Sequence, residues 1–102
     1  MYLVQILLPV YDNQGNSFSK KKFEFVRKLL TEKFGRLTSY LRAPAQGFWK
    51  DEKDEVVKDD IILFEVIQDK IDYYWWNTYK NKLKDDFCQD EIIIRSTKIE
   101  LL

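Results

Sequence analysis

Histidine is absent from this sequence of 102 residues, and cysteine occurs only once. The lack of histidine removes the commonest general base and the commonest transition-metal ligand. The single cysteine, Cys88, excludes an internal disulfide and is consistent with a reducing compartment, so we expect a cytoplasmic protein. Without a histidine to activate it as a nucleophile, Cys88 is expected to be a small core or boundary residue.

Net charge and long apolar runs are also missing. Lys plus Arg equals Asp plus Glu, at 17 each. A protein that holds nucleic-acid phosphates usually has a basic excess, so we expect no nucleic-acid partner. No apolar run approaches the ~20 residues of a membrane-spanning helix, so we expect no membrane association. The apolar first ten residues are interrupted by Pro9 and follow no basic segment, which favours a strand over a signal peptide.

Motifs for cofactors and metals are likewise lacking. The acidic pairs 59–60 and 85–86 do not have the spacing of a calcium loop. Gly15 and Gly47 stand in no phosphate-loop context. We therefore expect no cofactor and no bound metal.

The stretch from 59 to 76 gives the clearest structural prediction. It contains a strand over residues 61–67, in which six of seven residues are apolar and most are β-branched or aromatic. That composition is typical of a strand covered on both faces. Glu65 is its one charged residue. The chain then turns and enters a helix over residues 73–87, capped by Asp72.

Two further elements precede this stretch. Residues 2–11 alternate as a strand that is apolar on both faces and is interrupted by Gln5. Apolar residues then recur at helical spacing, and this helix runs from a cap at Ser17 or Ser19 to a left-handed C-cap at Gly35.

The remaining segments predict two more strands and a hairpin. Residues 36–43 form a weaker, more polar strand, and residues 91–102 form the last strand, in which three isoleucines follow Glu91. Between them, two apolar segments flank a charged turn, which indicates a projecting hairpin around 46–58.

The predicted order is β-α-β-β-α-β, which defines a single α+β domain over residues 1–102 with the ferredoxin-like arrangement. The expected sheet is antiparallel and four-stranded, with strand order 4-1-3-2 and both helices on one face. This order places the two most apolar strands, 2–11 and 61–67, at the centre of the sheet.

The chain resembles the dimeric α+β-barrel proteins, small ferredoxin-like domains that pair through their sheets. The resemblance is carried by the two central strands, the apolar last strand and the aromatic start of the second helix at 73–79. The stretch 36–60, with Arg-Ala-Pro-Ala at 42–45 and Phe-Trp at 48–49, also resembles a group of uncharacterised bacterial proteins of this size.

No diagnostic catalytic motif accompanies the resemblance. Members of the barrel superfamily include small oxygenases, isomerases and haem-processing enzymes. Histidine-ligated haem chemistry does not carry over, because this chain has no histidine. The resemblance therefore implies a fold and a homodimer, and it names no reaction.

The candidate site residues gather on the helix-free face of the predicted sheet. Gln5 and Glu65 each interrupt an apolar strand, and alternation points both toward that face. Arg95 joins them in one register of the last strand, whereas a shift of one residue sends it to the opposite face. The candidate ligand-binding set is completed by Tyr40, Arg42 and Trp49.

Two interpretations of this face stay open. In the first, the polar residues line a pocket for a small molecule, and Glu65 is the candidate catalytic residue of a small enzyme. In the second, Glu65 makes a structural pair with an arginine, and the face is only the dimer interface of a non-catalytic interaction or regulatory module. The aromatic residues 73–76 have a similar pair of interpretations, as a stacking platform for a ligand or as core and interface.

Assembly follows from the same pattern. Both faces of the central strands are apolar, but two helices cover only one face, so we predict a homodimer through the other. An RNA-recognition domain shares this topology, but its third strand carries a glycine-aromatic motif that residues 61–67 lack.

Overall fold

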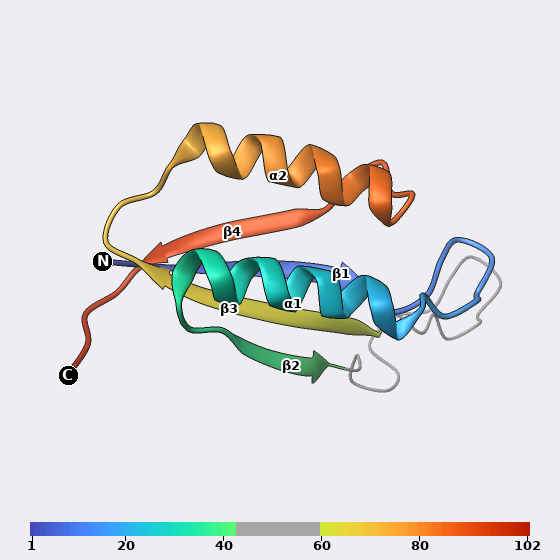
Figure 1. Ribbon diagram of the computed structural model, residues 1–102, viewed down its shortest axis with the longest axis horizontal. Helices are drawn as coiled ribbons and strands as arrows, with labels where there is room; N and C mark the ends of the chain where they lie inside the picture. Colours follow the sequence, from blue (N-terminus) through green and yellow to red (C-terminus); the bar gives the residue numbers. More distant parts are fainter. Residues whose placement is uncertain (43–59) are drawn as a thin grey trace, which may run out of the picture.

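The computed structural model describes residues 1–42 and 60–102 (Figure 1). It has an antiparallel sheet and two helices, so the predicted α+β class is confirmed. The elements in chain order are β1 (Tyr2–Pro9), α1 (Lys20–Phe34), β2 (Thr38–Arg42), β3 (Ile61–Gln68), α2 (Tyr73–Asp86) and β4 (Ile93–Lys98). The predicted hairpin around 46–58 and its Trp49 lie outside the described residues.

The sheet order is β2-β3-β1-β4, so β1 and β3 each have a strand neighbour on both sides. All three pairings are antiparallel. Gln5 of β1 stands opposite Glu65 of β3 on one side and Arg95 of β4 on the other. The two strands that are apolar on both faces thus form the middle of the sheet.

Side chains alternate between the two faces of the sheet along β1, and the two faces differ in burial. Val4, Ile6 and Leu8 are almost completely buried against the helices. Both helices cover this face (Figure 1), and they complete one core with Val26, Leu30, Trp76, Tyr79 and Leu83. The odd-numbered residues of β1 point the other way, to a face over which the described residues place no helix.

The two helices begin and end largely as the sequence predicts. Asp72 caps α2, because its side chain accepts a hydrogen bond of 3.0 Å from the Trp75 backbone N–H. Gly35 ends α1 at φ 79°, in the left-handed region that glycine occupies without strain. Ser19 is the N-cap residue of α1, but its side chain makes no capping hydrogen bond.

Several strand ends differ from the prediction. β1 stops at Pro9 and does not continue to residue 11, although the Val10 backbone N–H still donates to the Asp60 backbone oxygen over 3.0 Å. β2 begins at Thr38, two residues later than expected. β4 covers Ile93–Lys98 instead of 91–102, because Lys98 already pairs with Tyr2, the first residue of its partner strand.

Cys88 is another difference from the prediction. It is exposed and lies just after α2 with φ 50°, so it is neither a core nor a boundary residue. The turn that ends α2 requires a left-handed residue at this place, and here a cysteine takes the conformation that glycine usually supplies.

Within residues 1–42 and 60–102, neither helix has the length and apolar character needed to cross a bilayer.

Candidate functional site

A row of polar side chains crosses the helix-free face of the sheet, one from each of three neighbouring strands. The side-chain amide of Gln5 donates from Nε2 to Oε2 of Glu65 over 2.7 Å. The Oε1 atom of the same amide accepts from Nε of Arg95 over 2.8 Å. We name the three residues Glu65, Gln5 and Arg95 the polar row.

Strand register assembles the polar row. Gln5 faces Glu65 and Arg95 directly in the two ladders, and side chains opposite one another on one face lie within contact distance. The register of β4, which the sequence leaves open, is therefore the one that brings Arg95 to Gln5 and Glu65. These three of the six predicted site residues come together.

Glu65 and Arg95 do not contact each other directly. They lie two strands apart, so roughly 10 Å separates their backbones. Among the described residues no ion pair reaches Glu65, and the neutral amide of Gln5 stands between the carboxylate and the guanidinium. Glu65 is partly buried, while Arg95 is exposed.

The other predicted site residues, Tyr40, Arg42 and Trp49, are not shown to join the polar row. Tyr40 and Arg42 are described at the backbone only, in β2, where they pair with Leu63 and Ile61. Thr38, and not Arg42, stands opposite Glu65. Arg42 is four residues further along the ladder, roughly 13 Å away. Trp49 lies outside the described residues.

Apolar residues flank the polar row on both sides along the strands. Leu7 pairs with Leu63 and Ile93, and Leu3 pairs with Ile67. Leu63 is only 5% exposed, although it belongs to no part of the helix-side core. Ile67 and Ile93 remain 44% and 53% exposed. We name this surface, made of the polar row and its apolar neighbours, the open sheet face.

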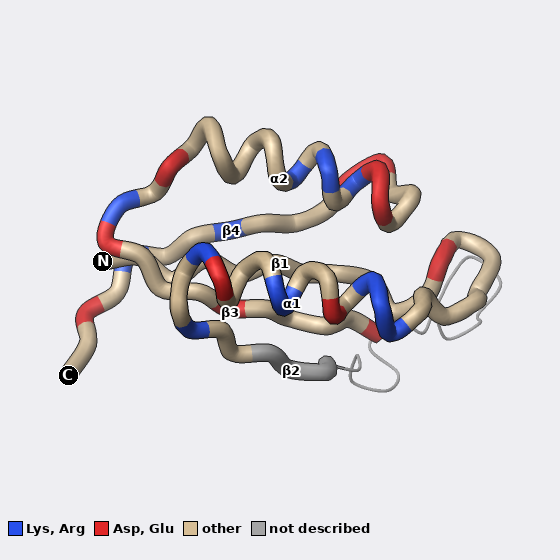
Figure 2. The backbone as a smooth tube through the Cα atoms, in the orientation of Figure 1, with Lys and Arg blue, Asp and Glu red and all other residues tan. Residues whose placement is uncertain are grey.

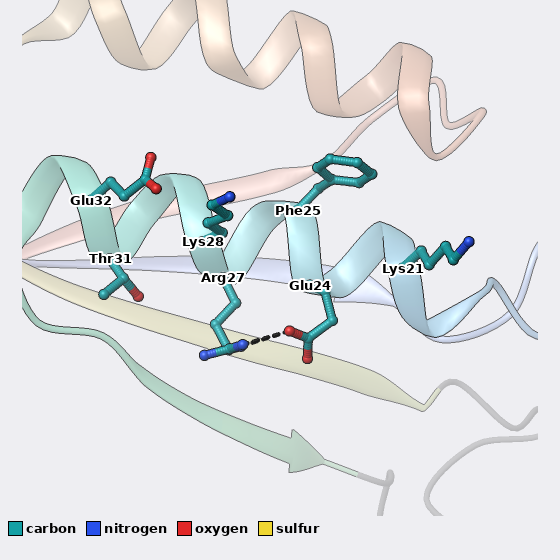
Figure 3. Close-up of a pocket in the computed structure, with 7 residues that line it drawn as sticks. All are labelled: Lys21, Glu24, Phe25, Arg27, Lys28, Thr31 and Glu32. Carbon is teal, nitrogen blue, oxygen red and sulfur yellow. Dashed lines mark hydrogen bonds and ion pairs between the residues drawn. The ribbon is translucent and has the colours of Figure 1, made fainter.

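Two cavities lie on the helix side of the molecule, and neither is lined by a residue of the polar row. One, of about 580 Å³, follows the outward side of α1 around Phe25 (Figure 3). All of its lining residues are exposed, and they include the ion pair of Glu24 and Arg27. It offers no buried polar group that would orient a ligand.

The second cavity, of about 550 Å³, lies between α1 and α2 and reaches Tyr79. Burial raises the pKa of the Tyr79 hydroxyl well above its ordinary value of 10.0, and the carboxylate of Asp86 adds to that shift. A phenol of this kind stays protonated at neutral pH, so it is a hydrogen-bonding group and no general base there.

The aromatic residues at the start of α2 differ in burial, since some belong to the core and others lie on the surface. Trp76 is 6% exposed and stacks on Phe34 with ring centroids 5.5 Å apart. Tyr73 and Tyr74 are 77% and 84% exposed. In the described part of the chain no group of acidic residues and cysteine has the arrangement of a metal site.

One interaction had no counterpart in the sequence prediction. Lys22, from the basic run at the start of α1, donates to the backbone oxygen of Asp86 at the end of α2. The positive charge of Lys22 is unfavourable at the N-terminus of α1, but it lies at the C-terminus of α2, where it complements the negative end of that helix dipole. Two helices far apart in the sequence must pack before this contact exists, so no local pattern predicts it.

Comparison with known proteins gives information about the fold and none about the function. No protein-family model and no curated protein sequence matches this chain. Among solved structures it is similar to a phage SAM lyase in complex with S-methyl-5′-thioadenosine, with a TM-score of 0.56 and 8% sequence identity. The similarity covers 95% of this chain and 80% of that chain. At this identity the likeness concerns the arrangement of helices and strands only.

Proposed function

We propose that the chain is a ferredoxin-like protein of the dimeric α+β-barrel type, and that it functions as a homodimer joined through the open sheet face. The observation that carries the proposal is the exposure of Ile67 and Ile93 beside Leu3 and Leu7, on a face that no described helix covers. Exposed apolar surface of this kind, crossed by a few polar groups, is typical of protein interfaces.

The surroundings of the polar row favour an interaction or regulatory module over an enzyme. The carboxylate of Glu65 is held by the amide of Gln5, which is itself held by Arg95. This single hydrogen bond leaves further lone pairs on the carboxylate, so the preference rests on the exposed apolar residues beside the row and on the absence of polar-row residues from the two described cavities. We place this module in the cytoplasm on the strength of its single cysteine.

Analytical ultracentrifugation of the wild-type chain tests the proposal. We expect a dimer at micromolar concentration, and we expect Ile93→Lys to give a monomer, because a lysine would be buried in the apolar interface. The matched control is Phe25→Lys, since Phe25 is an exposed apolar residue on α1. A wild-type chain that sediments as a 12.4 kDa monomer would refute the proposal.

A second candidate function is the binding of a small molecule on the same face, with a small enzyme as its strongest form. It is favoured by the placement of two charged groups and an amide among apolar residues. The similar solved structure suggests S-methyl-5′-thioadenosine as a first probe. Isothermal titration should then detect binding to the wild type and lose it in Gln5→Ala. Heat equal to that of buffer at millimolar probe would remove this ligand from consideration.

A further inference from the structure

The two charges of the polar row stand on opposite sides of β1. Glu65 is the one charged residue of β3, and Arg95 lies on β4, with Gln5 between them. Figure 2 shows the acidic position on β3 and the basic position on β4. Across the strands, the open sheet face therefore has a negative side and a positive side.

This polarity distinguishes the two simple ways in which the face can meet a copy of itself. A two-fold axis parallel to the strands exchanges the β3 side with the β4 side, so Glu65 faces Arg95 of the partner subunit. A two-fold axis perpendicular to the strands instead places β3 of one subunit over β3 of the other. Glu65 then faces Glu65 of the partner subunit, and the two carboxylates repel each other.

Resting on the homodimer proposed above, we infer that its two-fold axis runs parallel to the strands near Gln5, and that Glu65 and Arg95 of one subunit pair reciprocally with Arg95 and Glu65 of the partner subunit. The interface then contains two identical ion pairs, one on each side of the axis. The apolar residues on either side of the polar row meet their counterparts in the same arrangement.

Desolvation supplies a second reason for this geometry. Covering the open sheet face removes water from the partly buried carboxylate of Glu65, whose donor among the described residues is a neutral amide. A carboxylate that loses its water needs a nearby cation. Arg95 of the same subunit is two strands away, whereas Arg95 of the partner subunit comes directly over Glu65 when the axis follows the strands.

Charge reversal in sedimentation equilibrium tests the pairing. Glu65→Arg and Arg95→Glu should each raise the dimer dissociation constant at least tenfold, because each places like charges opposite one another. The double variant Glu65→Arg/Arg95→Glu should recover most of the affinity. An equimolar mixture of the two single variants should form heterodimers, since both contacts are then attractive. The control Lys28→Glu, on the exposed side of α1, should dimerise as the wild type does.

Each other outcome overturns the inference, and the outcomes separate it from the proposal on which it rests. Single variants that dimerise like the wild type would place the polar row outside the interface while leaving the homodimer intact. A wild-type chain that prefers the Glu65→Arg variant to itself would indicate the axis across the strands. A monomeric wild type would remove the homodimer and the inference together. Circular dichroism identifies a variant that fails to fold, and Glu65→Gln with Arg95→Gln then replaces it, with a smaller expected loss of affinity.

Discussion

At the scale of single residues, the open sheet face depends on one amide. A glutamine side chain has both donors and an acceptor, so Gln5 serves a carboxylate and a guanidinium at once. Each partner fixes the orientation of that amide for the other. Neither a second acid nor a second base at position 5 would satisfy both neighbours.

This arrangement sets the expected cost of changing Glu65. In the isolated subunit the described partner of Glu65 is an amide and not an arginine, so there Glu65→Gln keeps a hydrogen bond to Gln5 and leaves no buried cation unpaired. We expect the free energy of unfolding to fall by less than about 1 kcal/mol. Urea denaturation of Glu65→Gln in the monomeric Ile93→Lys background, compared with Ile93→Lys alone, measures the difference without a partner subunit.

The matched comparison is Gln5→Leu, which removes the donor from a partly buried carboxylate. That change should cost more, about 1–3 kcal/mol, because a polar group without its partner bears the full desolvation penalty. In the same monomeric background the opposite ranking, with Glu65→Gln the more harmful, would show that a cation of the same chain holds Glu65 directly.

The raised pKa of Tyr79 leads to a prediction about the stability of the protein at high pH. The pKa of this tyrosine is raised in the folded state, so the folded protein holds this proton at a pH where the unfolded chain has lost it. The resulting stabilisation is complete below the unfolded value of 10.0 and is lost as the pH rises above it. We expect the melting temperature to fall steeply above about pH 10. Tyr79→Phe should make this decline shallower, while Tyr74→Phe, at an exposed position, should leave it unchanged.

The sequence alone identified members of the candidate site where a polar residue interrupts an apolar strand. Gln5 and Glu65 stood out because each is a polar residue in an apolar strand, and the structure brings them into contact. The role of Arg95 was not decided by its own strand, since its face depends on the pairing of β4 with β1. The burial of Leu63 and the exposure of Ile93 likewise depend on contacts between segments far apart in the sequence, and composition does not record those contacts.

At the scale of elements, the helix starts offer a controlled pair of substitutions. The Asp72 side chain satisfies a backbone N–H at the start of α2, whereas the Ser19 side chain makes no such bond at the start of α1. Asp72→Ala should therefore lower the free energy of unfolding by about 1 kcal/mol, while Ser19→Ala should leave it almost unchanged. Thermal melts followed by circular dichroism compare the two, and equal losses would contradict the difference between these caps.

Element ends were the least predictable part of the fold. The predicted and observed strands overlap, but β1 ends early at a proline and β4 ends where its partner begins. The first limit coincides with the start of β3, because Pro9 pairs with Ile61, the first residue of that strand. The second is set by a strand far away in the sequence, and it becomes visible only when the two strands are aligned.

At the scale of the whole molecule, stability and assembly are coupled. One face of the sheet packs on two helices, and the described residues leave Ile67 and Ile93 of the other face in water. If the homodimer covers this face, the folded state gains free energy from association, and the melting temperature rises with protein concentration. We expect this rise in the wild type between 1 and 100 times its dimer dissociation constant. The Ile93→Lys variant should show a melting temperature that does not depend on concentration.

The α+β class was predictable because two signals agreed. Apolar alternation marked the strands, and helical spacing with flanking caps marked the helices. Function was not predictable to the same degree. The residues of the open sheet face are compatible with a ligand or with a second subunit, and the difference between the two lies in a partner that the sequence of one chain does not contain.

The position of β1 has a consequence for the order of events during synthesis. This strand leaves the ribosome before both of its neighbours, with Glu65 some 60 positions after Gln5 and Arg95 some 90 positions after it. At ~5–20 residues per second, β1 waits roughly 3–12 s for β3 and longer for β4. During that delay a segment that is apolar on both sides has no ladder to join, so it is exposed to incorrect pairing until β3 emerges.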